Sequence, residues 1–230
     1  DENKFIDLIL SRELYFCRMD LFPDKLEGIF PDEFLSNAPF DEKTRALIIQ
    51  NIKNFFGEYK KNVFVNCWHV NEKENINMWE EYGGGKGKEG FAIKSKVYRL
   101  HNSLISDPKP RITKVEYIDQ KDTVRLKSYF DNTDNLFRYK IKDDYEYENE
   151  IRAIIHLKNI FDMADELIST GSQKVMKCFR IGVSLNELIE SVYLSPFGKN
   201  RDTYRKFVRL KLLQNNINAP VHFSQYKDSI

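Results

Sequence analysis

The segment YEYENEIRAIIHL, residues 145–157, places several charged side chains at the start of an apolar stretch. If this stretch is a strand, alternate side chains share a face, so Glu148, Glu150 and Arg152 point to the same side. The opposite face is apolar and is expected to face the core. The charged face has two explanations: a solvent-facing ladder of ion pairs, or a site in which Arg152 sets the pKa and the orientation of a carboxylate. The residues alone leave both open, whereas Glu146 precedes the strand and is expected to be solvated.

A second segment, FVNCWHVNEKENINMWEEY at residues 64–82, concentrates residue types that often bind substrates. Its first part is predicted to be a strand and its last part a short helix. Trp79 and Tyr82 are three residues apart and share a face of that helix. They form either a stacking wall for a planar ring or a core-facing surface, and the spacing favours the core. The candidate binding residues on the strand are Cys67, Trp68 and His69.

Two further patterns test for phosphate binding. The glycine-rich stretch GGGKGKEG, residues 83–90, is not a phosphate loop, because Glu89 stands where a Ser or Thr is required and a helix precedes it. A flexible turn is predicted instead. Arg201 and Arg205 begin a stripe at spacing four, continued by Arg209, on a helix predicted over about 202–213. This stripe either binds the phosphates of a nucleic acid or dinucleotide, or is a solvated face, which is the commoner reason for such charge runs.

Composition limits the classes of protein and partner. The chain has 230 residues, of which 41% are hydrophobic, enough for a sizeable core. Its 36 basic and 35 acidic residues balance to +1, so no bulk attraction to nucleic acid or membranes is expected. The three cysteines lack paired spacing, which predicts a reduced, cytoplasmic setting. No apolar run reaches about 18 residues, so no membrane association is predicted. The histidines are scattered without an HExxH motif, and no metal is predicted.

Hydrophobic periodicity predicts one α+β domain over residues 1–230, with a central strand-rich core and flanking helices. A helix opens the chain, and a second helix begins at Asp41. Connectors are predicted at 22–40 and 131–135. A strand–helix–strand unit is predicted at about 183–226, and its first helix is expected to begin with a capping box of Ser184 and Glu187. The predicted strands are 14–17, 62–70, 91–96, 111–119, 150–157 and 179–185.

Three segments, FVNCWHVNEKENINMWEEYGGGKGKEGFAIKS, YEYENEIRAII and LIESVYLSPFGKN, occur in an order that resembles a bacterial family. This family is catalogued as domain of unknown function twenty-nine seventy-one, and its members occur near phage-defence and abortive-infection loci. The matching motifs are Cys67-Trp68, Met78-Trp79 with Tyr82, and Tyr147 to Arg152. The resemblance covers nearly the whole chain, and the family brings no settled activity with it.

A more distant resemblance is to ADP-ribosyltransferase folds. These use a first strand with Arg or His, then an aromatic residue that stacks on nicotinamide, and then a strand that begins with a catalytic glutamate, often within Glu-x-Glu. Glu148-x-Glu150 matches the last element, and Trp79 and Tyr82 match the second. The first has no clean counterpart, although Arg12 and Arg18 lie near the expected strand at 14–17.

This second resemblance implies roles for the candidate residues. Glu150 would stabilise the positive charge that develops on ribose when the nicotinamide bond breaks. Glu148 would orient or activate the acceptor, and Trp79 or Tyr82 would stack on the ring. Arg152 or a residue of the basic helix would face the pyrophosphate. The further candidates for substrate binding and phosphate binding are Tyr147, Cys67, Trp68, His69, Arg201 and Arg205.

The leading hypothesis is therefore a toxin-like effector of a bacterial phage-defence system that uses NAD as substrate. It would act as an ADP-ribosyltransferase on a protein or nucleic acid, or as an NAD glycohydrolase, with an antitoxin or another defence protein as a possible partner. The first alternative is a metal-dependent nuclease, although the common Glu-x-Lys arrangement is Glu150-Ile151-Arg152 here, and arginine is a poor neutral base. The second is a non-catalytic binding or inhibitor module in which these charges form a structural ladder.

Overall fold

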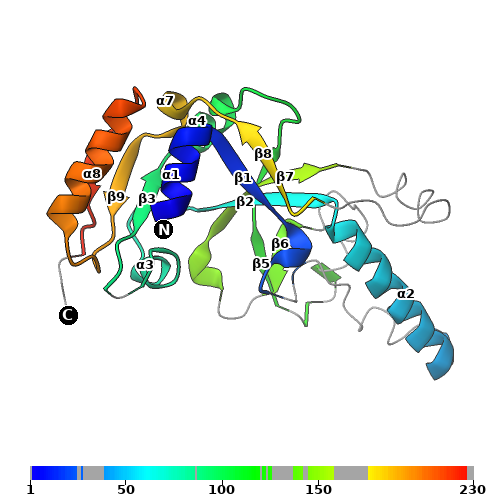
Figure 1. Cartoon of the computed structure of the whole chain (residues 1–230). Coiled ribbons are helices and arrows are strands. Elements are labelled where there is room, and N and C mark those ends of the chain that lie inside the picture. The colour runs from blue at the N-terminus through cyan, green and yellow to red at the C-terminus, as the bar shows by residue number, and fades with distance from the viewer. Residues whose placement is uncertain are drawn as a thin grey trace. The chain divides into compact units, whose positions relative to one another are not determined.

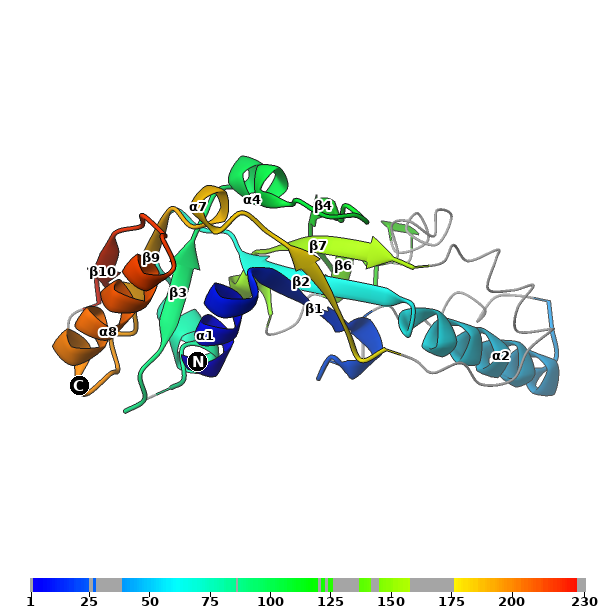
Figure 2. The ribbon, with the colours of Figure 1, turned by 45° about the horizontal axis from the view of Figure 1, so that its top comes forward.

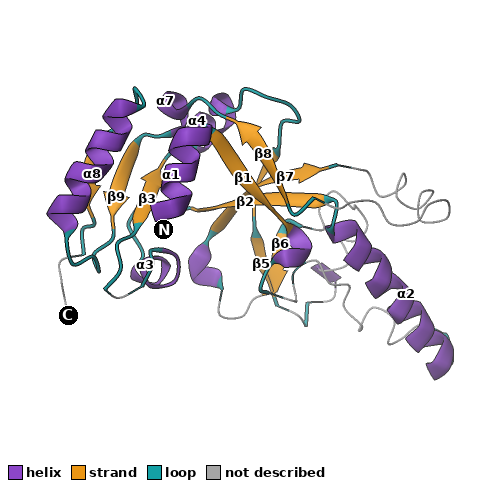
Figure 3. Cartoon of the chain, in the orientation of Figure 1, coloured by secondary structure: helices purple, strands orange, loops and turns teal. Residues whose placement is uncertain are grey.

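The chain folds as α+β, as predicted, and the computed structural model describes residues 2–24, 27, 39–85, 87–119, 121–122, 124–125, 137–141, 145–157 and 176–226. Within these ranges lie six α-helices and ten strands (Figures 1 and 3). They form two compact units that interleave along the sequence. Unit 1 comprises Asp1–Tyr15, Asn71–Lys109 and Arg180–Ile230, and unit 2 comprises Phe16–Val70 and Pro110–Phe179. That residues 1–230 act as one domain stays a prediction.

Unit 2 is built around two neighbouring antiparallel strands, β2 (Val63–His69) and β7 (Glu150–His156), which run side by side (Figure 2). In the register, His69 lies opposite Glu150 and Cys67 lies opposite Arg152. β4 (Arg111–Lys114) pairs with the other side of β7, and β1 (Glu13–Arg18) pairs with the other side of β2. The sheet order is β4-β7-β2-β1-β8, with β8 at Cys178–Gly182. β7 is therefore an interior strand.

The core of unit 2 explains why this sheet forms. Val63, Val65 and Ile154 project from one face of β2 and β7, where branched side chains pack well, and they meet Tyr59 and Phe137. Tyr59 belongs to the long helix α2 (Glu42–Lys60), whose first turn is capped by the side chain of Asp41. The smaller elements of unit 2 are η1 (Met19–Leu21), β5 (Glu116–Ile118), β6 (Tyr139–Ile141) and η4 (Glu146–Glu148). β5 and β6 pair in parallel.

Unit 1 contains a second sheet in which β9 (Ser191–Leu194) lies between β3 (Phe91–Lys94) and β10 (Val221–Phe223). β9 runs antiparallel to β3 and parallel to β10. The helix α8 (Arg201–Gln214) connects the two parallel strands and packs against both, which confirms the predicted strand–helix–strand unit. The remaining helices of unit 1 are α1 (Glu2–Ser11), α3 (Ile76–Tyr82), α4 (Val97–Ser103) and α7 (Leu185–Leu188).

Several local predictions differ from the structure. The expected strand 111–119 is divided into β4 and β5 at Val115, and β6 was not predicted. Ser184 stands at the N-cap of α7, but its side chain makes no capping hydrogen bond, so the predicted capping box is wrong. Most of the connector 22–40 and all of the loop 131–135 lie outside the described residues. No helix in the described part of the chain is long and apolar enough to cross a membrane.

Candidate functional site

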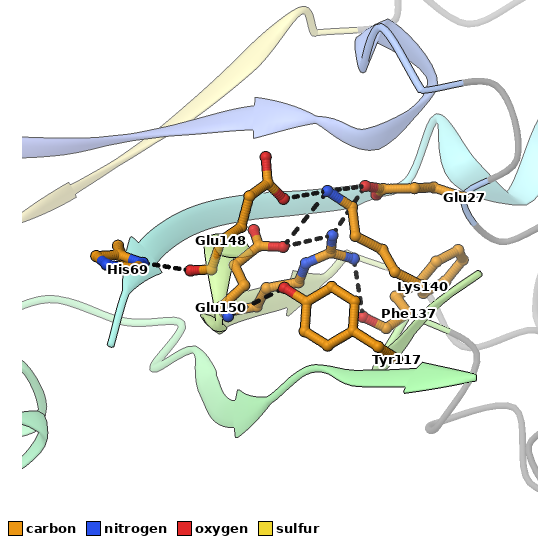
Figure 4. A network of polar contacts seen from close by, with 8 residues as sticks. Glu27, His69, Tyr117, Phe137, Lys140, Glu148 and Glu150 are labelled. Atoms are coloured by element: carbon orange, nitrogen blue, oxygen red, sulfur yellow. Dashed lines mark hydrogen bonds and ion pairs between the residues drawn. The ribbon is translucent and has the colours of Figure 1, made fainter. Parts of the chain in front are cut away.

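Five charged side chains meet in the interior of unit 2 (Figure 4). We call them the charge cluster: Glu27, Lys140, Glu148, Glu150 and Arg152. Their exposed fractions lie between 0% for Arg152 and 6% for Lys140 and Glu150. The charged face of β7 is therefore buried in protein, and the explanation as a solvent-facing ladder is wrong.

Arg152 lies on β7, which has a neighbouring strand on each side. It stands opposite Cys67 of β2 and Thr113 of β4. One guanidinium nitrogen, Nη1, donates to the carbonyl oxygen of Phe137 at 3.2 Å. The other, Nη2, donates to Glu150 at 2.8 Å and to Glu27 at 2.9 Å.

Glu148 reaches the cluster from a turn and not from the strand. It ends the 3₁₀ helix η4, and Asn149 then adopts a left-handed conformation with φ of 37° before β7 begins at Glu150. Asn149 suits this conformation, and its side chain donates to the carbonyl of Val70. The predicted strand alternation from Glu148 to Glu150 is wrong, yet the turn brings both carboxylates to the same lysine.

That lysine is Lys140 of β6. Its Nζ lies 2.6 Å from Glu148 Oε2, 3.0 Å from Glu27 Oε1 and 3.8 Å from Glu150 Oε2. Three carboxylates thus surround two cations, which leaves the cluster with a formal charge of −1. Such a concentration of charge in the interior is costly, because each ion loses its hydration and only mutual attraction offsets the loss.

The neighbouring charges determine the protonation states. Burial alone would raise the pKa of Glu150, but the charge and hydrogen bond of Arg152, together with Lys140, hold this pKa below its ordinary value. Burial would lower the pKa of Lys140 and of Arg152, but the carboxylates around them raise both above their ordinary values. Glu150 is therefore ionised at neutral pH, and Lys140 is a cation that cannot serve as a neutral base.

Two residues border the cluster through backbone contacts. The backbone N–H of Glu150 donates to the hydroxyl of Tyr117 at 3.2 Å, and burial raises the pKa of Tyr117 to about 12. His69 faces the carbonyl oxygen of Glu148 with Nδ1 (Figure 4). Because a carbonyl only accepts, Nδ1 carries the proton, and Nε2 is buried with no hydrogen-bond partner in the described part of the chain.

The other predicted residues of this segment separate between the two faces of the sheet. Cys67 shares the face of Arg152, and although it keeps exposed surface, the protein atoms around its sulfur and the carboxylate of Glu150 raise its thiol pKa. Trp68 points to the opposite face, where its indole N–H donates to Asn66. Tyr147 lies in η4 and is partly exposed. Cys67 and His69 thus lie on the face of the cluster, and Trp68 does not.

The predicted stacking residues belong to unit 1 and have different environments. Trp79 is only 5% exposed, and its indole N–H donates to Glu74 at 2.8 Å, whereas Tyr82 is 55% exposed. They do not form one exposed wall, and Trp79 is a core residue of its unit. The substrate-binding role of Tyr82 stays a prediction.

The arginines of the basic stripe also differ in their environments. The guanidinium groups of Arg201 and Arg205 lie over the ring of Phe223, at 4.7 and 5.0 Å from its centroid, and both residues are partly buried. Arg209 is exposed. The first two arginines therefore help to pack α8 against β10, and their phosphate-binding role stays a prediction.

The glycine-rich turn is tied to the loop before α8. Gly84 and Gly87 have positive φ angles, of 94° and 77°, which glycine adopts without strain. Glu89 accepts a hydrogen bond from the backbone of Asn200 at 2.8 Å, and Gly90 accepts one from Ser195 at 2.9 Å. A Cβ at Gly90 would overlap the carbonyl oxygen of Gly83, so these glycines allow the two ends of the turn to approach closely.

Sequence reasoning missed Glu27, Lys140 and Tyr117. Glu27 is 125 residues from its partner Arg152, and no local pattern distinguishes it. The sequence gives only a weak indication for Lys140. If Tyr139 and Ile141 lie on a strand that is covered on both faces, the lysine between them must also point into the interior. Among the described residues, no group of three or more His, Cys, Asp or Glu side chains is arranged to hold a metal ion.

Comparisons with known proteins add no relative to this picture. No protein-family model, curated protein or solved structure matched the chain. The family resemblances remain expectations from the sequence, and the functional proposals depend on the geometry of the charge cluster.

Proposed function

We propose that the charge cluster is the catalytic centre of an effector that uses NAD as substrate, of the toxin-like, phage-defence type that the sequence suggests. The observation that carries this proposal is that Glu150 is fixed and ionised at the start of β7, held by Arg152 at 2.8 Å. The enzyme would break the bond between nicotinamide and ribose and transfer ADP-ribose to a macromolecule or to water.

The chemistry needs a carboxylate of this kind. As the glycosidic bond breaks, its electron pair leaves with the nicotinamide nitrogen, and positive charge develops on the ribose. A preorganised negative group beside the ribose stabilises that charge without reorganising during the reaction. Glu150 would supply this group. Glu148, held by Lys140, would orient the acceptor.

The cost of the cluster supports a functional role over a purely structural one. Apolar residues of similar volume often stabilise a fold as well as a buried ion pair does. Five charges in one interior site therefore point to a use beyond stability, and perturbed pKa values are commonest at functional sites. The pKa values of Glu150, Lys140 and Arg152 all depart from their ordinary values.

The experiment compares wild-type protein with Glu150→Gln. We expect the wild type to consume NAD or to label a cell lysate with ADP-ribose, and Glu150→Gln to reduce the rate by about 10²- to 10³-fold, as loss of one electrostatic stabiliser does. Glu58→Gln is the matched control, because Glu58 is an exposed carboxylate paired with Lys61. This variant should have the activity of the wild type. Wild-type protein that neither consumes NAD nor labels lysate would refute the proposal, as would a fully active Glu150→Gln.

A second candidate is a non-catalytic binding module, and the mutual pairing of the buried charges favours it. Under this alternative the cluster only stabilises unit 2, so Glu150→Ala would lower the midpoint of thermal unfolding while the protein has no activity to lose. A melt of this variant beside the NAD assay separates the two functions.

For the nuclease alternative, the structure adds a lysine beside the carboxylates, but this lysine cannot act as a base. Lys140 lies beside Glu148 and Glu150, where the sequence offered only Arg152. Its raised pKa keeps it protonated, however, so it cannot take a proton from a water nucleophile at neutral pH. This observation places the nuclease behind the other two candidates.

A further inference from the structure

The three-stranded sheet of unit 1, with β9 between β3 and β10, has two faces of different character (Figure 2). In the register, Phe91 lies opposite Leu194, and Leu194 lies opposite Phe223. Phe91 packs on Phe5 of α1 and on Tyr204 of α8, so the face that carries this row is covered by helices. Because neighbours along a strand point to opposite sides, the next row belongs to the other face.

That next row consists of Ala92, Tyr193 and His222, which lie opposite one another on β3, β9 and β10. Ala92 and His222 are exposed, and Tyr193 is partly exposed. The rings of Tyr193 and His222 are paired, with centroids 5.2 Å apart and 36° between their planes. Such a cross-strand pair stabilises a sheet. Here it also presents aromatic surface to the solvent.

Two lysines follow this row along the chain. Lys94 comes two residues after Ala92 on β3 and therefore points to the same side of the sheet. The ammonium groups of Lys94 and Lys96 each lie 3.6 Å from a carboxylate oxygen of Glu190, and their side chains are 53% and 56% exposed. Two cations share one carboxylate, and exposed ion pairs of this kind are weak. Both lysines can therefore bind a second anion without losing a strong contact.

An open ring pair with cations beside it fits single-stranded nucleic acid. An unpaired base offers a ring face that stacks on the aromatic side chains of a sheet, and the neighbouring phosphates attract lysines. A double helix fits poorly, because its bases are already stacked on one another. An acidic peptide would use the lysines and leave the rings without a partner. The net charge of +1 gives the chain no general attraction to nucleic acid, so a local surface must supply it.

We propose that Tyr193, His222, Lys94 and Lys96 form a docking surface for single-stranded nucleic acid. A base stacks on the ring pair, and the phosphates beside it contact the two lysines. This inference goes beyond the proposed function and does not depend on it, because the four residues belong to unit 1 and the charge cluster belongs to unit 2. Recognition by stacking and phosphate contacts tolerates many sequences.

The test measures fluorescence anisotropy of labelled single-stranded RNA and DNA of about a dozen nucleotides, with duplex DNA for comparison. Two phosphate contacts should contribute about −1.4 to the slope of log K against log salt concentration, and the double variant Lys94→Gln with Lys96→Gln should lose this contribution. His222→Ala should weaken binding at least about fivefold, the lower end for loss of one stacked base. His222→Phe keeps a ring and should bind as the wild type does.

Two controls remove the same groups elsewhere. The double variant Lys43→Gln with Lys114→Gln removes two exposed lysines of unit 2, and His101→Ala removes an exposed histidine of α4. Both controls should keep the affinity and the salt slope of the wild type. If thermal melts show that His222→Ala does not fold, the salt slope of the lysine variants decides the outcome.

The proposal is overturned if neither single strand binds at low salt, or if duplex DNA or polyglutamate binds as tightly as the single strands do. It is also overturned if a folded His222→Ala keeps the affinity of the wild type, or if the lysine variants keep its salt slope. A protein that binds single strands but never consumes NAD would retain this surface and refute only the proposed function. Consumption of NAD without any binding of single strands would do the reverse.

Discussion

Replacement of Arg152 by methionine removes the central cation of the charge cluster while keeping much of the side chain's volume. Arg152 is fully buried, so solvent does not screen its ion pairs with Glu150 at 2.8 Å and Glu27 at 2.9 Å. Breaking a buried pair from one side costs about 3–5 kcal/mol, because a charge is left without compensation. Lys140 still contacts both carboxylates, at 3.8 and 3.0 Å, and we therefore expect the lower end, a loss of about 3 kcal/mol in the free energy of unfolding.

Urea denaturation at pH 7 measures this loss. The matched control is Arg125→Met, which breaks an exposed ion pair with Glu116 and should cost less than about 1 kcal/mol. At lower pH the deficit of Arg152→Met should shrink, since protonation of Glu150 removes a charge that lost its partner. A loss below about 1 kcal/mol at pH 7, or a deficit that grows on acidification, would refute the electrostatic reasoning.

Three further predictions concern single features. Because the pKa of Glu150 is lowered in the folded protein, its ionised form contributes stability above the ordinary value of 4.5. This contribution should be lost as the pH falls through the lowered pKa. A series of thermal melts should therefore show a fall in the unfolding midpoint below about pH 4.5, and this fall should be smaller in Glu150→Gln. Asn149→Ala should destabilise by about 1–2 kcal/mol because of the φ of 37°, whereas Asn149→Gly should avoid the strain, and equal losses by denaturation would contradict this reason. Trp79→Phe should cost more than about 1 kcal/mol, because it removes the hydrogen bond to Glu74 and also shortens a buried ring, which leaves a void. An unchanged melt would contradict both reasons.

Local pattern was sufficient for the elements that carry the site and for the class of fold. Alternation predicted strands around Cys67 and around Arg152, and the apolar spacing predicted α2 and the strand–helix–strand unit, because periodicity directly reflects which side chains share a face. It also placed Glu150 and Arg152 on one face, whereas its reason for adding Glu148 to that face was wrong. What it left open was whether their shared face met solvent or protein.

Tertiary structure decided that question, because the burial of a sheet face depends on which elements pack over it. Pairing with both β2 and β4 makes β7 an interior strand, and β6 brings Lys140 to it. The 3₁₀ turn, and not strand alternation, directs Glu148 to Lys140. Glu27 is 125 residues from Arg152 in the sequence, and helix or strand periodicity does not extend over such a separation.

The sequence by itself therefore determined which strand carries Glu150 and Arg152, since that information is local. Only the tertiary structure determined that these charges are buried, that Lys140 and Glu27 complete them, and that Trp79 belongs to a core. The physical reason is that ionisation and hydrogen bonding of a side chain depend on its neighbours in space, and those neighbours come from segments with no periodic relation in the chain.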